Sequence, residues 1–178
     1  MPTPNIPAQN AATALQVIEV LGLKLDESLI AQVFKQTSLP GRRQLINNHP
    51  SVMLDVAHNP QATLLLSEEL ANLPYQKVIA VVAMLQDKDI KATLAPMLSV
   101  ISHWHCASLQ VPRGAKSDVL VSAVSSSKQK VLDYESVETA YKMAVTNANK
   151  NDLVIVFGSF FTVASVLNMG ELTPQEKV

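Results

Sequence analysis

The feature that most limits the fold is an apolar run at residues 52–54 that continues into Asp55, Val56, Ala57, His58, Asn59 and Pro60. The Asn-Pro pair is typical of a helix start, with Asn59 as the N-cap and Pro60 in the first turn. Open α/β sheets form ligand sites where a buried strand ends in polar side chains and a helix follows. The stretch therefore predicts such a sheet and a candidate site around Asp55 and His58.

The rest of the chain alternates between short apolar runs and longer amphipathic segments. Strands separated by helices require right-handed crossovers, which predicts an α/β fold: a Rossmann-like, mostly parallel sheet of about six strands with helices on both faces. Pro96 lies inside one expected helix and predicts a kink or a later start there. The expected strands are 44–46, 52–54, 78–82, 103–107, 131–132 and 153–157, and the expected helices are 11–21, 26–36, 60–73, 89–100, 118–124, 136–149 and 160–167.

A break at Ser38-Leu39-Pro40-Gly41 predicts a boundary, because a Pro-Gly pair marks a turn or linker. A chain of 178 residues can bury one good core and a short appendage. We expect a helical segment at 1–38 and the α/β domain at 39–178.

Composition excludes several classes of function. Fourteen basic and 15 acidic residues give a net charge of -1, and the basic residues are scattered, which argues against nucleic-acid binding. The single cysteine, Cys106, cannot form an internal disulfide and favours a reducing, cytoplasmic location. No apolar run approaches the roughly 18 residues that cross a bilayer. We expect a monomer without a nucleic-acid or membrane partner.

Polar side chains that follow different strands are expected to meet in one crevice, since the carboxyl ends of parallel strands share an edge. These residues are Asp55, His58, Lys88 in Asp87-Lys88-Asp89, Arg113 in Pro112-Arg113-Gly114, and Ser159 after Gly158.

Each candidate also has a plain structural interpretation. Asp55 either accepts hydrogen bonds from a ribose diol or starts a turn, and His58 is either a catalyst or a local hydrogen-bond partner. Arg42 either reaches a phosphate or is a solvated linker residue. The backbone N–H groups at Gly158-Ser159 are suited to an anion such as a carboxylate.

We expect no metal site among His49, His103 and His105, which lack acidic or thiolate neighbours at metal-ligand spacing. The sequence contains neither a Gly-x-x-x-x-Gly-Lys-Ser/Thr loop nor Gly-x-Gly-x-x-Gly. Part of a nucleotide-binding machinery is therefore absent from these 178 residues.

Five motifs occur in a characteristic order: Pro40-Gly41-Arg42, residues 55–60, Met-Leu-Gln-Asp-Lys-Asp at 84–89, Pro-Arg-Gly-Ala at 112–115 and Phe-Gly-Ser-Phe-Phe-Thr-Val-Ala at 157–164. Together they resemble the C-terminal domain of the dihydrofolate synthase/folylpolyglutamate synthase family, in the Mur-ligase superfamily. Residues 10–15 resemble the end of the central ATPase domain of that family. The resemblance implies a C-terminal portion of a longer enzyme, with a C-terminal domain of the Mur-ligase type.

The resemblance implies an ATP-dependent ligase. ATP phosphorylates a carboxylate of dihydropteroate or a folate, and the amino group of L-glutamate attacks the acyl phosphate to give an amide. The central domain of the same enzyme would be the partner of this chain and would supply the phosphate loop and the Mg²⁺ ligands. We therefore expect the chain alone to be inactive.

The resemblance also implies roles for residues in the matching motifs. Asn10 would contact adenine, Arg42 the terminal phosphates and Asp55 the ribose. Arg43 stands where the family has an aromatic or aliphatic residue, so either arginine is a candidate for the phosphate contact. His58 and Ser159 would lie near the incoming glutamate and the transferred phosphoryl group, as the catalytic candidates. Arg113 and Lys88 are further candidates for glutamate binding.

Two alternatives remain open at this point. One is a fragment of a Mur ligase that acts on peptidoglycan precursors, because those enzymes share Asp-x-x-His-Asn-Pro. The other is a non-catalytic nucleotide-binding module. The contexts of Asp87-Lys88-Asp89 and Gly158-Ser159-Phe160 favour a folate ligase, and the motif at Asn10 argues against an autonomous module.

Overall fold

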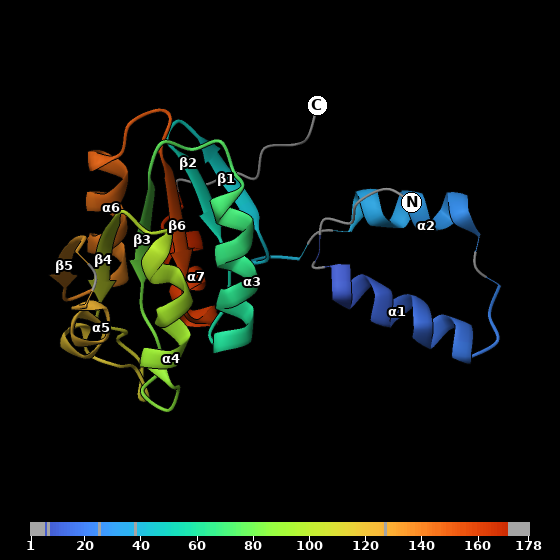
Figure 1. Cartoon of the computed structure of the whole chain (residues 1–178), viewed down its shortest axis with the longest axis horizontal. Helices are drawn as coiled ribbons and strands as arrows, with labels where there is room; N and C mark the ends of the chain where they lie inside the picture. Colours follow the sequence, from blue (N-terminus) through green and yellow to red (C-terminus); the bar gives the residue numbers. More distant parts are fainter. Residues whose placement is uncertain (1–5, 7, 25, 38, 127, 171–178) are drawn as a thin grey trace. The chain divides into compact units, whose positions relative to one another are not determined.

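The structure is a computed structural model that describes residues 6, 8–24, 26–37, 39–126 and 128–170. The chain divides into two compact units, residues 1–44 and 45–178 (Figure 1). No helix among the described residues is both long and apolar enough to cross a membrane.

The first unit contains two helices, α1 (Ala8–Val20) and α2 (Glu27–Gln36), at the positions that the apolar spacing predicts. Asp26 is the N-cap of α2 and accepts hydrogen bonds from the backbone N–H groups of Ser28 and Leu29. The Ser28 hydroxyl also donates to this carboxylate and, with the backbone bonds, lowers the pKa of Asp26.

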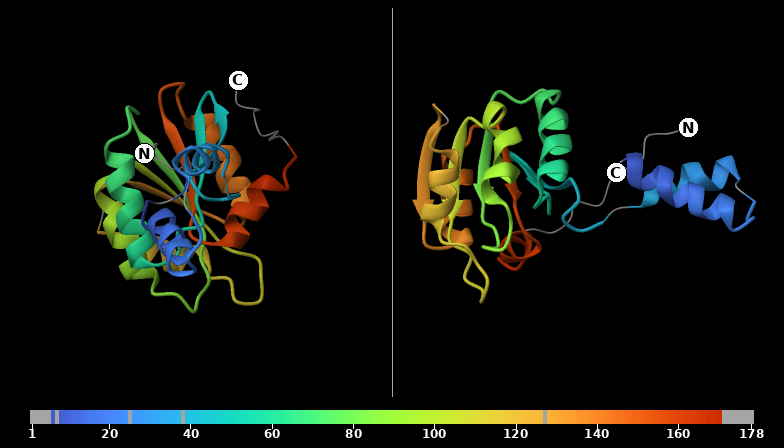
Figure 2. Two further views of the ribbon diagram at one scale, coloured as in Figure 1. Left: turned by 90° about the vertical axis from the view of Figure 1, so that its right-hand side faces the viewer. Right: turned by 60° about the horizontal axis from the view of Figure 1, so that its bottom comes forward.

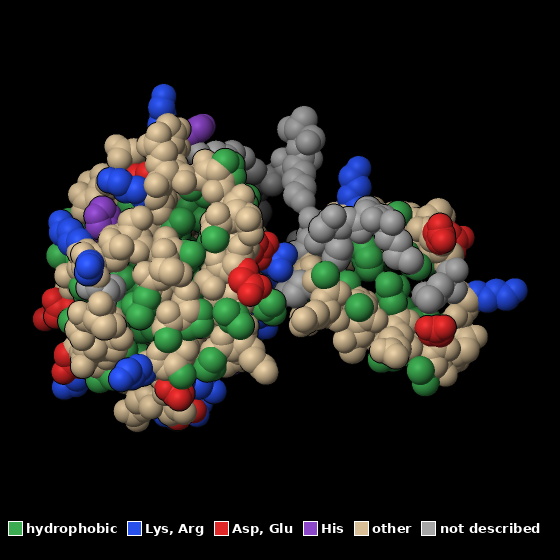
Figure 3. Space-filling model, in the orientation of Figure 1, with side chains coloured by type: hydrophobic (Ala, Val, Ile, Leu, Met, Phe, Trp, Pro, Cys, Tyr) green, Lys and Arg blue, Asp and Glu red, His purple; other side chains and the backbone are tan. Residues whose placement is uncertain are grey.

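These two helices bury little apolar surface in the described residues. Ala11 and Ile30 are their buried side chains. Large apolar side chains remain exposed on or next to the helices: Val17, Val20, Leu21, Leu23, Leu29 and Val33. Figure 3 shows hydrophobic atoms at the surface of this unit.

The second unit is built on one sheet, which among the described residues has six strands in the order β1-β2-β6-β3-β4-β5. Four neighbouring pairs, β2–β6, β6–β3, β3–β4 and β4–β5, are parallel. The turn at 49–50, with a cis His49–Pro50 bond, joins β1 to β2 and is too short for a crossover, so β1 runs antiparallel to β2. The bounds are β1 Gln44–Asn48, β2 Ser51–Leu54, β3 Val78–Val82, β4 His103–Ala107, β5 Lys130–Tyr134 and β6 Leu153–Phe157.

Helices cover both faces of this sheet, which confirms the predicted fold class (Figure 2). On one face, α3 (Pro60–Ala71), α4 (Ile90–Leu94) and α5 (Ser117–Val124) pack against a core that includes Ile155 and Phe157 of β6. On the other face, α6 (Val137–Asn147) and α7 (Phe160–Leu167) pack against Val154 and Val156. Successive side chains of a strand point to opposite faces, so a strand covered on both sides is apolar throughout.

The helix expected at 89–100 is not continuous, and its irregularity lies at the position that Pro96 predicts. The chain forms α4 up to Leu94 and then a 3-10 helix, η1 (Ala95–Ser99), with Pro96 in its first turn. Proline lacks the backbone N–H and its ring clashes with the preceding turn, so the α-helical hydrogen bonds end there. The strand predicted at 131–132 is longer, because β5 pairs with β4 from His103↔Lys130 to Ala107↔Tyr134.

Candidate functional site

The loops that follow β2 and β6 lie side by side at the carboxyl edge of the sheet, since these two strands are neighbours. The backbone N–H of Asp55 donates to the carbonyl of Val156 at 2.9 Å and extends the pairing by one residue. Gly158 has φ +110°, and a Cβ atom there would lie 2.5 Å from the carbonyl oxygen of Ala83. Only glycine permits the loop after β6 to approach the end of β3 so closely.

The first loop orients a carboxylate and an imidazole. Asp55 is buried, and its Oδ1 accepts a hydrogen bond from the backbone N–H of Ala57 at 2.8 Å. Nδ1 of His58 lies 2.8 Å from the carbonyl oxygen of Val56. A carbonyl only accepts, so Nδ1 carries the proton and Nε2 of the neutral ring is an acceptor.

Side chains cap both of the following helices, and the cap of α3 is the one that the Asn59-Pro60 pair predicts. The side chain of Asn59 accepts from the N–H of Ala62 at 2.9 Å, and Pro60 begins α3. Ser159 is buried and caps α7, where its Oγ accepts from the N–H of Phe161 at 3.0 Å. The caps fix the direction in which each loop enters its helix.

A pocket of about 170 Å³ opens between these loops and the loop after β3. It combines an imidazole, an ammonium group and a hydroxyl with an apolar wall. Pockets with a few convergent polar groups and apolar walls are typical of sites for small molecules, and the ammonium group favours an anionic one. Its lining residues are His58, Leu85, Lys88, Gly158, Ser159, Phe160 and Phe161.

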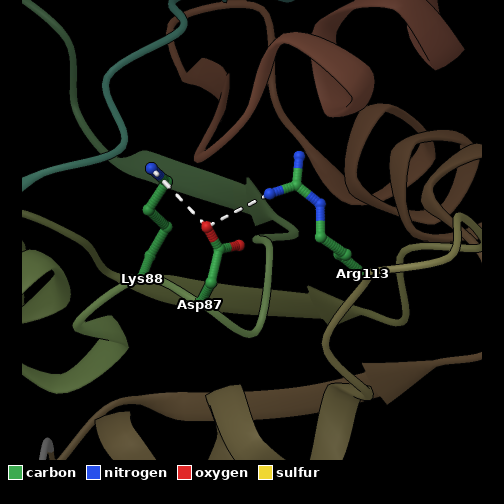
Figure 4. A network of polar contacts seen from close by, with 3 residues as sticks. All are labelled: Asp87, Lys88 and Arg113. Atoms are coloured by element: carbon green, nitrogen blue, oxygen red, sulfur yellow. Dashed lines mark hydrogen bonds and ion pairs between the residues drawn. The ribbon is translucent and has the colours of Figure 1, made fainter.

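Lys88 belongs to a small ion-pair network at the rim (Figure 4). Asp87 Oδ2 accepts a hydrogen bond from Arg113 Nη1 at 3.4 Å and lies 4.0 Å from Lys88 Nζ. Arg113 does not line the pocket itself. Asp87 connects it to Lys88, which is a lining residue. The three side chains carry one net positive charge.

The pocket therefore brings together three of the residues singled out by the sequence, His58, Lys88 and Ser159. Asn10 is exposed on α1, and Arg42 is half-buried in the turn after Gly41, both within the unit 1–44. Arg43 has a backbone φ of +48°, which is unusual for a residue other than glycine.

Sequence reasoning missed the apolar wall of the pocket. Leu85, Phe160 and Phe161 contribute to it, and the two phenylalanines are 59% and 47% exposed. The ring centroids of His58 and Phe160 are 6.3 Å apart. Two consecutive aromatic residues directly after Gly158-Ser159, at the start of an otherwise amphipathic helix, are the signal that indicates a pocket wall.

Other reactive groups of the sheet lie outside this pocket. Burial, with a smaller contribution from Asp133, raises the pKa of the Cys106 thiol to about 12, so this cysteine is not a nucleophile at neutral pH. In the described part of the chain, no three His, Cys, Asp or Glu side chains are grouped as a metal site would require.

The sequence is similar to proteins of known function. The sequence model of a family described as "Mur ligase, glutamate ligase domain" matches residues 41–160. The dihydrofolate synthase/folylpolyglutamate synthase of Escherichia coli (strain K12) is 41% identical over 170 residues. That alignment covers 95% of this chain and 39% of the relative, so the chain spans about two fifths of the relative's length.

Solved structures share the fold. "E.coli FolC in complex with DHPP and ADP" has a TM-score of 0.88 at 40% identity, over 95% of this chain and 40% of that one. A bifunctional folylpolyglutamate synthase/dihydrofolate synthase with Mn, AMPPNP and L-glutamate bound has a TM-score of 0.87 at 44% identity, over 95% and 41%. With the fold, the ordered motifs and the family match in agreement, this chain belongs to the Mur ligase glutamate ligase domain family.

Proposed function

We propose that this chain is the C-terminal portion of an ATP-dependent ligase that joins L-glutamate to dihydropteroate, to folates or to both through an acyl phosphate. The observation that carries the proposal is the pairing of β2 with β6. It places the Asp55–His58 loop beside the Gly158–Ser159 loop, and Lys88 completes the pocket. The similarity to dihydrofolate synthase/folylpolyglutamate synthase supports the same reaction.

In this proposal the pocket holds L-glutamate. Lys88, with Arg113 behind it, attracts a carboxylate, and Leu85, Phe160 and Phe161 contact the aliphatic part of the amino acid. Nε2 of His58, left as an acceptor by the hydrogen bond of Nδ1 to Val56, takes a proton from the amino group as it attacks. Ser159 contributes a hydroxyl and the N-terminus of α7 beside the transferred phosphoryl group.

The nucleotide contacts complete the proposal. Asp55 holds the ribose with its carboxylate, which Ala57 orients. Arg42 and Asn10 contact the terminal phosphates and the adenine. A related structure holds Mn and AMPPNP, and we propose that the protein uses ATP with Mg²⁺. The phosphate loop and the metal ligands belong to a central ATPase domain outside these 178 residues.

We assign residues 1–38 to the end of that central domain and residues 39–178 to the glutamate-ligase domain. The exposed apolar side chains of α1 and α2 support this assignment, because such a surface needs a partner. The central domain is the partner that we propose, within a monomeric cytoplasmic enzyme.

An NMR titration of the labelled chain tests the site. We expect Mg-ATP to shift the backbone amides around Asp55, and L-glutamate to shift those around His58 and Ser159. Asp55→Asn should abolish the first set of shifts and retain the second. Glutamate-dependent shifts that avoid the pocket would contradict the proposed site.

A chimaera tests the reaction. The E. coli synthase is rebuilt with this chain in place of its matching segment, and ATP-dependent formation of dihydrofolate from dihydropteroate and L-glutamate is measured. We expect activity from the chimaera and none from the 178-residue chain alone. His58→Ala should lower kcat by about 10²-fold or more if the imidazole moves a proton. A folded chimaera that binds ATP and glutamate but forms no amide would contradict the proposed function.

A further inference from the structure

The rim of the pocket already contains a carboxylate between two cations. Asp87 Oδ2 meets Arg113 Nη1 at 3.4 Å and lies 4.0 Å from Lys88 Nζ, and Figure 4 shows the carboxylate between the two basic side chains. Lys88 also faces the pocket, together with His58. A side chain of the protein therefore occupies the position in which a carboxylate of a ligand would meet both cations.

These ion pairs are not needed to hold the two loops together. The backbone N–H of Gln86 donates to the carbonyl of Arg113 at 2.8 Å, and that of Ala115 donates to the carbonyl of Met84 at 2.9 Å. Both bonds use backbone atoms, so they persist when a side chain changes. The Asp87 carboxylate is therefore not required to hold the loops together.

The ion pairs are also weak enough to be exchanged. The side chains of Lys88, Asp87 and Arg113 are 36%, 43% and 65% exposed, and both contacts are long for charged partners. Water and salt screen such pairs strongly. A carboxylate from a ligand that also uses the pocket has additional contacts and therefore competes well with Asp87.

We propose that Asp87 is a resident competitor that occupies the carboxylate-binding position at Lys88 and Arg113 and sets the affinity of the pocket for a dicarboxylic amino acid. The inference rests on the proposed function, because it concerns the pocket assigned above to L-glutamate. Asp87 prevents small anions from pairing with both cations, and a substrate carboxylate displaces it. Removal of the Asp87 charge should strengthen the binding of L-glutamate. If Asp87 had only a structural role, its neutralisation would not strengthen binding.

The test is an NMR titration of the 178-residue chain and three variants with L-glutamate. Asp87→Asn removes the competing charge and keeps the size of the side chain. Asp89→Asn is the matched control, because it changes the net charge equally two residues away. Asp89 caps α4 by accepting from the N–H of Ala92 at 3.0 Å, and asparagine caps equally well. Asp87→Glu keeps a carboxylate at the rim.

We expect Asp87→Asn to bind L-glutamate about three- to fivefold more tightly than the unchanged chain, as expected for one charge removed at close range in water. Asp89→Asn and Asp87→Glu should change the Kd less than about twofold. An amide spectrum that retains its dispersion shows that each variant is folded.

Other outcomes separate the inference from the proposed function. If the unchanged chain binds L-glutamate at the His58 and Ser159 amides but Asp87→Asn binds no more tightly, the inference is wrong and the pocket assignment remains. An equal gain in Asp87→Asn and Asp89→Asn would also overturn it, since the effect would then be one of net charge. If no variant shifts these amides up to the solubility limit of L-glutamate, the glutamate pocket and the inference are both wrong.

Discussion

Two histidines of this chain are in opposite chemical environments. His58 lies at the rim of the pocket and its ring is close to Phe160. His105, in β4, is 2% exposed and stacks on Tyr134 with ring centroids 5.3 Å apart. Nδ1 of His105 has no hydrogen-bond partner among the described residues. Burial, together with the positive charges of His103 and Lys130, lowers the pKa of His105 to about 4.

The stability of the protein should therefore decrease in mild acid. Between pH 6.5 and 4 the unfolded state binds a proton at His105 that the folded state does not, so the free energy of unfolding falls as the pH falls. The slope from this residue is at most about 1.4 kcal/mol per pH unit. Urea unfolding at several pH values measures it, and His105→Phe, which keeps a stacked ring, should have a smaller slope. Equal slopes in both proteins would contradict the lowered pKa.

Thr162 stabilises the fold through one buried hydrogen bond. Its Oγ1 donates to the carbonyl of Ala83 at 2.7 Å and joins the first turn of α7 to the end of β3. Thr162→Val keeps the shape and leaves that carbonyl without this donor, so it should lower the free energy of unfolding by about 1–3 kcal/mol. Thr146→Val is the control, because Thr146 is exposed and bonds within its own helix. Similar losses in both variants would argue against a special role for Thr162.

At the scale of elements, apolar periodicity predicts the central strands well. β3, β4 and β6 have the expected bounds: β3 and β6 are apolar throughout, and β4, which contains His103 and His105, is buried at four of its five residues. β5 carries charged residues at Lys130 and Asp133 and lies at the sheet edge, so its length depends on pairing with β4 rather than on its own pattern. The place of β6 between β2 and β3 depends on long-range pairing, which no local pattern contains.

The same distinction applies to the candidate site. The sequence indicates which loops carry polar residues, because each follows a strand and precedes a helix. It does not indicate that Asp87 meets Arg113, which is 26 residues away and belongs to a loop after another strand. Nor does it place Arg42 and Asn10 relative to the pocket, because those residues belong to a different compact unit.

The start of α3 depends on its cap. Asn59 accepts from the N–H of Ala62, and this helix carries no acidic residue in its first turn. Asn59→Ala should lower the free energy of unfolding by about 1 kcal/mol, whereas Asn59→Ser should lower it by a few tenths. Thermal or chemical unfolding monitored by circular dichroism measures the difference. If alanine and serine are equivalent, the side-chain cap contributes nothing.

At the scale of the whole molecule, the two units differ in how much they bury. The sheet unit has apolar cores on both faces of its strands, whereas α1 and α2 bury Ala11 and Ile30 among their described residues. Short helices with little packing are marginally stable in water. The first unit should therefore depend on a partner for its stability, as the proposed central domain would provide.

Hydrogen exchange of the isolated chain checks this difference. Amides of α1 and α2 should exchange orders of magnitude faster than those of β3 and β6. The hydrogen bonds of these two central strands break only when the core unfolds. In the chimaera described above, the same helices should become protected. Strong protection of α1 and α2 in the isolated chain would show that they need no partner.

During synthesis on the ribosome, β6 is the last strand of this sheet to emerge. β2 and β3 pair with β6 on its two sides, so each exposes an apolar, unpaired edge while residues 83–152 are being made. Exposed edges of this kind readily pair with other chains. Nascent chains that have not yet reached Leu153 thus carry two separate parts of the sheet with aggregation-prone edges. The five residues of β6 then join these parts into one sheet.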